Sequence, residues 1–243
     1  MTVMKEARPL QDLLLQLGSS NKLNVFQKAK QQNFTTFFSG PQQIRDLFEV
    51  DYDTTTHRNF VFQDLIDDKK CLEDGRRFVD DQLERFKGFL TATKGFKFFS
   101  TIFLDDYGVR KKAIDLDLNE TLTNLESNGI FQNTTLIITS YNLSDKELTG
   151  ADEDDKNPFL AVRLSDEWKK RYPQKFDFLN MNFNRLVLSS NTYELIMNLL
   201  EPNSTSSESP WFTALSIFRT CSDLGISKNT CLCMNTVEYC LRV

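Results

Sequence analysis

Histidine and glycine are scarce in this chain, and their scarcity excludes several kinds of catalytic site. Of 243 residues, one is histidine (His57) and nine are glycine. Any Ser-His, Cys-His or histidine–metal mechanism would have to use His57, which lies in the polar stretch 54–59, typical of a solvated loop. The motifs G-x-S-x-G, G-x-x-x-x-G-K-[ST] and G-x-G-x-x-G do not occur. The sequence therefore indicates no catalytic residue, no phosphate-binding loop and no small-molecule cofactor.

Long apolar runs and an excess of basic residues are also absent. No apolar run approaches the roughly 20 residues of a membrane-spanning helix. The 29 Lys and Arg against 34 Asp and Glu give a net charge of −5, which excludes nucleic-acid binding through overall charge. Residues 1–9 lack the apolar segment of a signal peptide. We therefore expect a cytoplasmic or nuclear protein without a membrane span.

Triplets of the N-glycosylation type are nevertheless present. They begin at Asn33, Asn119, Asn133, Asn142 and Asn203, and an N-x-C triplet begins at Asn229. Because no secretory signal precedes them, we interpret these triplets as a by-product of the high Asn and Thr content.

The five cysteines are unevenly distributed. Cys71 is isolated, whereas Cys221, Cys231, Cys233 and Cys240 lie close to the C-terminus. The odd number and the expected intracellular setting argue against a disulfide framework. The spacing C-x9-C-x-C-x6-C differs from the paired C-x2-C of zinc ribbons. We predict buried free thiols without metal; a thiolate zinc site and redox or disulfide chemistry are the alternatives.

Helical patterns dominate both ends of the chain. The clearest predicted helix covers 71–93, where Val79, Leu83, Phe86 and Leu90 form one apolar stripe of 3.6-residue period. Within it, Asp81 and Arg85 are four residues apart in the favourable order for an ion pair. Further helices are predicted at 9–17, 21–32, 41–48, 59–69, 166–172 and 191–200, and from 210. The state of 175–189 is not fixed by its pattern.

The middle of the chain has strand patterns. Residues 96–104 are aromatic and β-branched, 105–108 resemble a turn, and 109–118 alternate with Ile114, Leu116 and Leu118 on one face. A short helix with Leu122 and Leu125 follows, and then a strand at 135–141. The predicted fold class is α+β, mostly helical, with a small central mixed sheet made of a hairpin at 96–118 and the strand 135–141.

The order of these central elements resembles the ubiquitin-like β-grasp over residues 95–142. The stretches that carry the resemblance are 114–118, 121–125 (T-L-T-N-L), 129–130 (G-I) and 135–138 (T-L-I-I). The helix is shorter than in ubiquitin, the middle strands are reduced, and no Gly-Gly tail follows the last strand, so conjugation is not implied. The resemblance implies a docking surface and a last strand parallel to the first. An unrelated α+β arrangement with one hairpin is the alternative.

A β-grasp would place eight apolar residues in one core. They are Phe98, Ile102, Ile114, Leu116, Leu122, Leu125, Leu136 and Ile138. On this interpretation Leu116→Ala costs roughly 2–5 kcal/mol, whereas Asp115→Ala on the opposite face costs no more than about 0.5 kcal/mol.

The domain organisation follows from these patterns. We predict a helical region at 1–94, a β-grasp-like region at 95–142, an acidic loop at 143–157 and a mainly helical region at 158–243. Within the last, 201–209 is a flexible Ser-rich segment.

Two groups of charged residues are candidate sites. Arg110, Lys111 and Lys112 form a local basic run that, with Arg76, Arg77, Lys94 and Lys97 around it, suits RNA or phosphate; lysines that protect a strand edge are the simpler interpretation. The carboxylates of Asp105, Asp106, Asp115 and Asp117 on the predicted hairpin resemble a metal-dependent nuclease site, or a solvated strand face.

The absence of a catalytic constellation and the high aromatic content favour a non-enzymatic protein-interaction or assembly subunit, with a protein as its partner. One alternative is a small viral or nucleic-acid-associated accessory factor that uses Arg110, Lys111 and Lys112. The other is a metal-dependent hydrolase or nuclease that uses the hairpin carboxylates.

Overall fold

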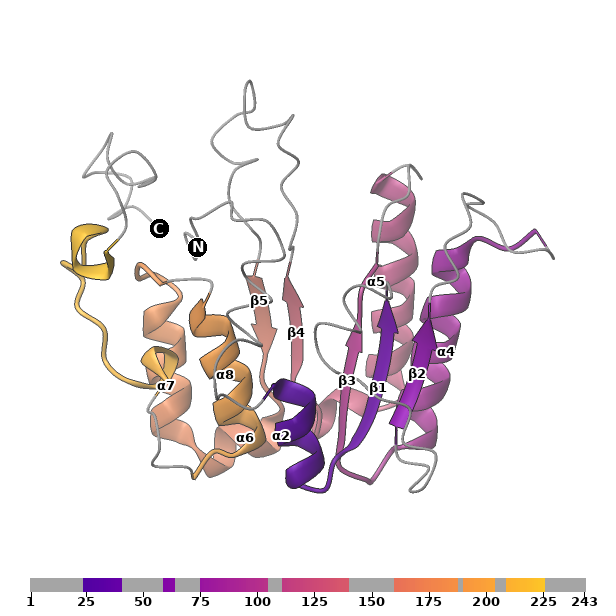
Figure 1. Ribbon diagram of the computed structural model, residues 1–243, viewed down its shortest axis with the longest axis horizontal. Coiled ribbons are helices and arrows are strands. Elements are labelled where there is room, and N and C mark those ends of the chain that lie inside the picture. Colours follow the sequence, from indigo (N-terminus) through magenta and orange to yellow (C-terminus); the bar gives the residue numbers. More distant parts are fainter. Residues whose placement is uncertain are drawn as a thin grey trace. The chain divides into compact units, whose positions relative to one another are not determined.

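The structure, a computed structural model, describes residues 24–40, 59–63, 75–104, 111–139, 160–187, 190–203 and 209–225. They belong to two compact units (Figure 1), a first unit within residues 20–132 and a second unit that begins at Asn133. Both units combine helices with a small sheet, so the predicted α+β class is confirmed. Among the helices of the described part, none has the length and hydropathy that a bilayer crossing requires.

The first unit contains a parallel sheet of three strands. The strands are β1 (Thr35–Gly40), β2 (Asn59–Gln63) and β3 (Phe98–Ile102), in the order β2-β1-β3. Parallel neighbours need crossover connections, and α4 (Phe78–Ala92) lies between β2 and β3 in the chain. The predicted helix at 59–69 is therefore wrong where it overlaps β2. The run Phe60-Val61-Phe62 is β-prone, and pairing with β1 makes it a strand.

Helices cover the two faces of the central strand. Phe37 packs against Phe89 of α4 with ring centroids 4.8 Å apart. The next residue, Phe38, packs against Phe26 of α2 (Val25–Gln31) at 6.0 Å. Because successive side chains of a strand point to opposite faces, α4 and α2 lie on opposite sides of β1. A strand buried on both faces has a continuous apolar pattern, which explains the aromatic run here.

Helix α4 confirms the main helical prediction. Val79, Leu83, Phe86 and Leu90, the predicted stripe, are all buried. The helix begins at Phe78, several residues after the predicted start at Cys71. Asp80 and Asp81 in its first turn are favourable there because they face the positive end of the helix dipole.

The predicted hairpin at 96–118 is wrong. Its first half contains β3, but Lys111–Ser127 form the helix α5. Ile114, Leu118, Leu122 and Leu125 recur at intervals of three and four, so the stretch fits a helix as well as a strand. In the helix Leu125 is fully buried, whereas Leu116 lies on the outer side and is 67% exposed.

Leu116→Ala is therefore expected to change the free energy of unfolding by no more than about 0.5 kcal/mol, because surface substitutions away from special features have small effects. This value replaces the larger loss expected from a β-grasp core. Asp115, its exposed neighbour on α5, is the matched control and should behave alike on truncation to alanine. Urea unfolding measures both changes. A loss above 2 kcal/mol for Leu116→Ala alone would contradict the helical assignment.

The last strand of the predicted β-grasp is present but pairs elsewhere. β4 (Leu136–Thr139) lies within the predicted strand 135–141. It pairs antiparallel with β5 (Leu160–Arg163), with Leu136 opposite Arg163. This two-stranded sheet belongs to the second unit and is separate from the sheet of β3. A β-grasp requires its last strand, here β4, to pair in parallel with its first strand, here β3. Among the described strands β4 pairs only with β5, so the β-grasp interpretation is wrong.

The second unit has a core of its own beside this sheet. Its helices are α6 (Asp166–Arg171), α7 (Pro173–Asn182), α8 (Ser190–Leu200) and the short 3-10 helices η3 (Pro210–Phe212) and η4 (Ser222–Leu224). The buried residues of the core are Leu164, Trp168, Leu179, Val187, Leu195, Trp211 and Phe212. Ser165 caps α6 by accepting from the Trp168 N–H at 3.2 Å. Of residues 175–189, whose pattern does not fix their state, 175–182 belong to α7.

The predicted acidic loop at 143–157 lies outside the described residues, as do 204–208 of the predicted flexible segment. The last residue of that segment, Ser209, is fully buried. Its side chain accepts from the Trp211 N–H and begins η3. Ser209 is thus part of the folded second unit.

Candidate functional site

The strand order of the parallel sheet indicates where a ligand would bind, at the edge formed by the carboxyl ends of the strands. The strand order β2-β1-β3 reverses at β1, and in open sheets ligands bind outside the carboxyl ends of the strands where the order reverses. Helix α4 runs antiparallel to the strands, because Gln82 contacts the end of β1 and Phe89 contacts Phe98 at the start of β3. The N-terminal half of α4 therefore lies at this edge.

A buried polar contact closes the edge between β1 and β3. Gln82 Nε2 donates to Ser39 Oγ and to the carbonyl oxygen of Phe103, both at 3.2 Å. Ser39 and Gln82 are almost completely buried. At Gly40 an added Cβ would lie 2.9 Å from the Phe103 ring, so the backbone needs glycine for this close approach. These residues tie α4 to the ends of two strands.

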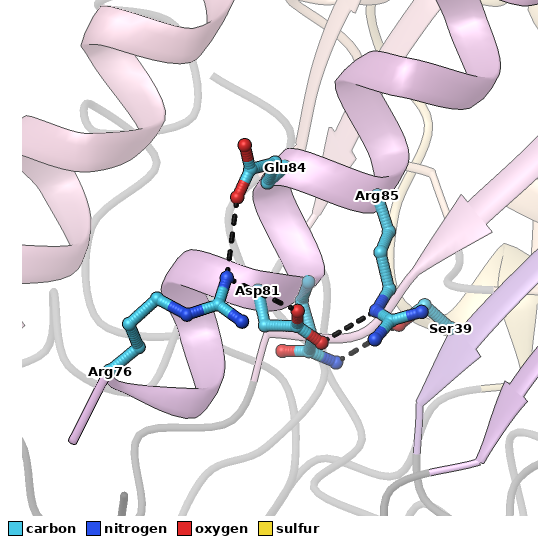
Figure 2. A network of polar contacts seen from close by, with 6 residues as sticks. Ser39, Arg76, Asp81, Glu84 and Arg85 are labelled. Atoms are coloured by element: carbon cyan, nitrogen blue, oxygen red, sulfur yellow. Dashed lines mark hydrogen bonds and ion pairs between the residues drawn. The ribbon is translucent and has the colours of Figure 1, made fainter. Parts of the chain in front are cut away.

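An ion-pair network lies on α4 next to this contact (Figure 2). Arg76 Nη1 is 3.4 Å from Glu84 Oε2 and 3.6 Å from Asp81 Oδ1. Arg85 Nε lies 2.6 Å from Asp81 Oδ2, which confirms the pair expected from their four-residue spacing. Asp81 is thus held between two guanidinium groups. Such exposed ion pairs contribute little to stability individually, but they place Asp81 between Arg76 and Arg85.

Arg77 joins α4 to α5. It donates to both oxygens of Asp80, at 2.9 and 2.6 Å, and its Nη2 is also 2.8 Å from Asp117 Oδ2. The hydrogen bond to Asp80 and the charges of both carboxylates raise the pKa of Arg77. Arg77 sits at the start of one helix and Asp117 in the first half of the other, so the pair fixes these two helix ends together.

The four cations expected beside the 110–112 run each have a contact within the protein. Arg76 and Arg77 are paired with carboxylates, and Lys94 Nζ donates to the Asn128 carbonyl oxygen at 2.7 Å. Lys97 lies over the Phe34 ring at 5.6 Å.

The predicted site residues themselves are only partly placed. Arg110 lies outside the described residues, and Lys111 and Lys112 begin α5, with their side chains outside the description. Their role in binding nucleic acid or phosphate stays a prediction.

The predicted carboxylate cluster required a strand, but its described members lie on a helix. Asp105, Asp106 and the predicted loop histidine His57 lie outside the described residues. Asp115 and Asp117 lie on a helix, where a two-residue spacing does not place side chains on one face. Asp115 is exposed, and Asp117 is paired with Arg77. The strand face on which the hydrolase hypothesis depends is not formed.

Cys221 corrects the prediction of free thiols. It is buried and disulfide-bonded. No other cysteine lies within the described part of the chain. A sulfur in a disulfide is not a thiolate ligand for zinc.

The sequence pattern did not predict that two neighbouring apolar residues are exposed. Ile217 is 50% and Phe218 78% exposed, and they follow the half-buried Leu215. We call them the 217–218 tip. The pattern alone predicted a helix from 210, on which apolar residues face the core. Instead the helix ends at Phe212, and the chain continues as a loop.

Hydrogen bonds hold the loop that carries the 217–218 tip. The Phe218 N–H donates to Ser216 Oγ at 3.1 Å, and Arg219 Nη1 donates to the Leu186 carbonyl oxygen at 3.2 Å. Asp223 accepts from the N–H and the hydroxyl of Thr220, both at 2.8 Å, and these bonds lower the pKa of Asp223. The tip is therefore presented from an ordered loop.

Comparison with known proteins gives a family. The sequence model of a family described as "Protein of unknown function (DUF229)" matches residues 49–241. The chain belongs to this family. The DUF229 match includes α4, with its ion-pair network, and the 217–218 tip, but it begins after β1, so Ser39 lies outside it. No curated protein and no solved structure matches this DUF229 chain.

Proposed function

We propose that the protein is a protein-interaction or assembly subunit that docks a partner protein through the 217–218 tip. The observation that carries the proposal is the exposure of Ile217 and Phe218 next to each other on an ordered loop. A single exposed apolar residue is ordinary in a soluble protein. Ile217 and Phe218 are adjacent, and contiguous exposed apolar surface marks interaction sites as the patch grows large.

The loop is suited to act as an anchor. Its base is fixed by Arg219 and by the Thr220–Asp223 hydrogen bonds, so little conformational entropy is lost when a partner binds. Polar Ser216 and Arg219 flank the apolar pair, which is the arrangement of an apolar interface centre with a polar rim. The partner that fits is a protein with an apolar pocket that receives the Phe218 ring.

Support for the two alternative functions is weaker. The cations around the 110–112 run are engaged in ion pairs and hydrogen bonds, and the hydrolase hypothesis has lost its strand face. The intracellular setting expected from the sequence is not part of this proposal, because the disulfide bond of Cys221 is typical of an oxidising compartment.

Phe218→Ala is expected to weaken partner binding by roughly tenfold or more, since burial of a phenylalanine contributes about 1.5–3 kcal/mol. The partner is recovered from the native host by affinity capture of the wild-type chain, and its affinity for each variant is then measured by calorimetry.

Phe96→Ala is the matched control, because Phe96 is as exposed, at 73%, but stands alone in the first unit. It should leave the affinity unchanged. Equal affinities of wild type, Phe218→Ala and an Ile217→Ser/Phe218→Ser double variant would refute docking through the tip.

A further inference from the structure

Every described asparagine that begins an N-x-S/T triplet has an exposed side chain. These residues are Asn33, Asn119, Asn133 and Asn203. Asn33 lies in the turn between α2 and β1 and has a positive φ of 61°. Asn133 directly follows the 3-10 helix η1 (Ile130–Gln132), and Asn203 follows α8. Asn119 lies on the exposed side of α5. A bulky substituent on any of the four would extend into solvent.

The buried asparagines form a separate group. Asn24, Asn182, Asn191 and Asn198 are buried, and none begins such a triplet. Asn24 caps α2, Asn182 donates to three carbonyl oxygens of the loop at η3, and Asn198 donates to the Glu194 carbonyl oxygen. Among the described residues, therefore, every buried asparagine is at a position without the glycosylation signal.

The disulfide bond of Cys221 is an independent indication of compartment. Disulfides form and persist in the lumen of the secretory pathway and are rare in the cytosol. N-x-S/T triplets are read as glycan acceptors on the surface of proteins in that same compartment. We propose that this protein folds in the secretory pathway and carries N-linked glycans on Asn33, Asn119, Asn133 and Asn203.

The modification is a group transfer without any redox step. The donor is an oligosaccharide bound through its anomeric carbon to a polyprenyl diphosphate, and the host's oligosaccharyltransferase is the catalyst. The asparagine Nδ2 forms a bond to the anomeric carbon, the bond from that carbon to the diphosphate oxygen breaks, and the diphosphate leaves with the electron pair. One amide proton passes to a base.

The test uses the protein purified from its own host. Peptide-N-glycosidase treatment in ¹⁸O-labelled water converts each glycosylated asparagine to a labelled aspartate, which peptide mass spectrometry locates. Label is expected at the four asparagines and not at Asn180 or Asn184, which are exposed but begin no triplet. The proposal fails for every one of the four that stays unlabelled, and it fails completely when none is labelled.

Variants and the disulfide provide separate measurements. Asn133→Gln and Asn203→Gln should each remove one glycan step from the mass of the protein made in the host, whereas Asn180→Gln should remove none. Alkylation of the protein unfolded in guanidinium chloride without reductant should leave Cys221 unmodified, because burial no longer protects a free thiol there. A host-derived protein in which Cys221 is alkylated without reduction would overturn the assignment to the secretory pathway.

Discussion

Phe37→Ala is expected to lower the free energy of unfolding of the first unit by about 3–5 kcal/mol, the usual loss for a phenylalanine removed from a packed core. Phe37 lies on the central strand and is 1% exposed. Its ring contacts Phe86 at 6.2 Å and Phe89 at 4.8 Å between centroids. The substitution therefore leaves a cavity between the sheet and α4, at the contact that positions the polar network of the candidate site.

Urea unfolding measures this loss, and amide exchange of β1 and α4 shows whether it falls on the first unit. Phe96→Ala is the matched control, because the same atoms are removed from a side chain that is 73% exposed. It should change stability by no more than about 0.5 kcal/mol. Similar losses for the two variants would mean that α4 does not pack on β1 as described.

Periodic patterns predicted the helices that bury one face. The stripe from Val79 to Leu90 predicted α4, and its apolar residues are buried. The helix predicted at 191–200 is found as α8, and within its first turns Asn191 Nδ2 donates to Glu194 Oε2 at 2.9 Å. Both signals are local, because the interacting residues are three or four apart and a helix brings them together by itself.

The strands were harder to predict because their partners are distant in sequence. β3 was expected to pair with the residues just after it, but it pairs with β1, with Thr35 opposite Phe98. The alternating residues Ile114, Leu116 and Leu118 fitted a hairpin strand when considered alone. Parallel pairing needs no hairpin, and the helix α5 can bury Leu125 while Leu116 faces solvent. Pairing across more than 60 residues leaves no local signal of its register.

The contacts of the candidate site also differ in whether the sequence predicts them. The Asp81–Arg85 pair follows from spacing within one helix and is found at 2.6 Å. The contact of Arg77 with Asp117 joins residues 40 positions apart, and only the packing of α4 against α5 creates it. The exposure of Phe218 also depends on where η3 ends, since the residues before it, Trp211 and Phe212, are buried. Composition alone does not separate an apolar residue in a core from one on a loop.

A single asparagine holds the loop that leads to the 217–218 tip. Asn182, at the end of α7, is fully buried. Its Nδ2 donates to the carbonyl oxygens of Pro210, Trp211 and Thr213, at 2.9, 3.1 and 2.6 Å. Its Oδ1 accepts from the Leu215 N–H at 3.3 Å. One side chain thus contacts four backbone groups of a segment that has no regular secondary structure after η3, with its two amide hydrogens shared among the three carbonyl oxygens.

Asn182→Ala is expected to destabilise the second unit by about 3 kcal/mol, because buried backbone groups that lose their partner cost roughly 1–3 kcal/mol each and water can relieve some of them. Asn182→Asp keeps the shape but loses both donors and places a negative charge beside carbonyl oxygens, so its loss should be at least as large. Asn180→Ala, two residues earlier on the exposed side of α7, is the control and should be near zero. Urea unfolding gives the three values, and amide exchange should show the largest increase in residues 211–215. Protection there that is unchanged in Asn182→Ala would show that packing of Trp211, rather than this amide, holds the loop.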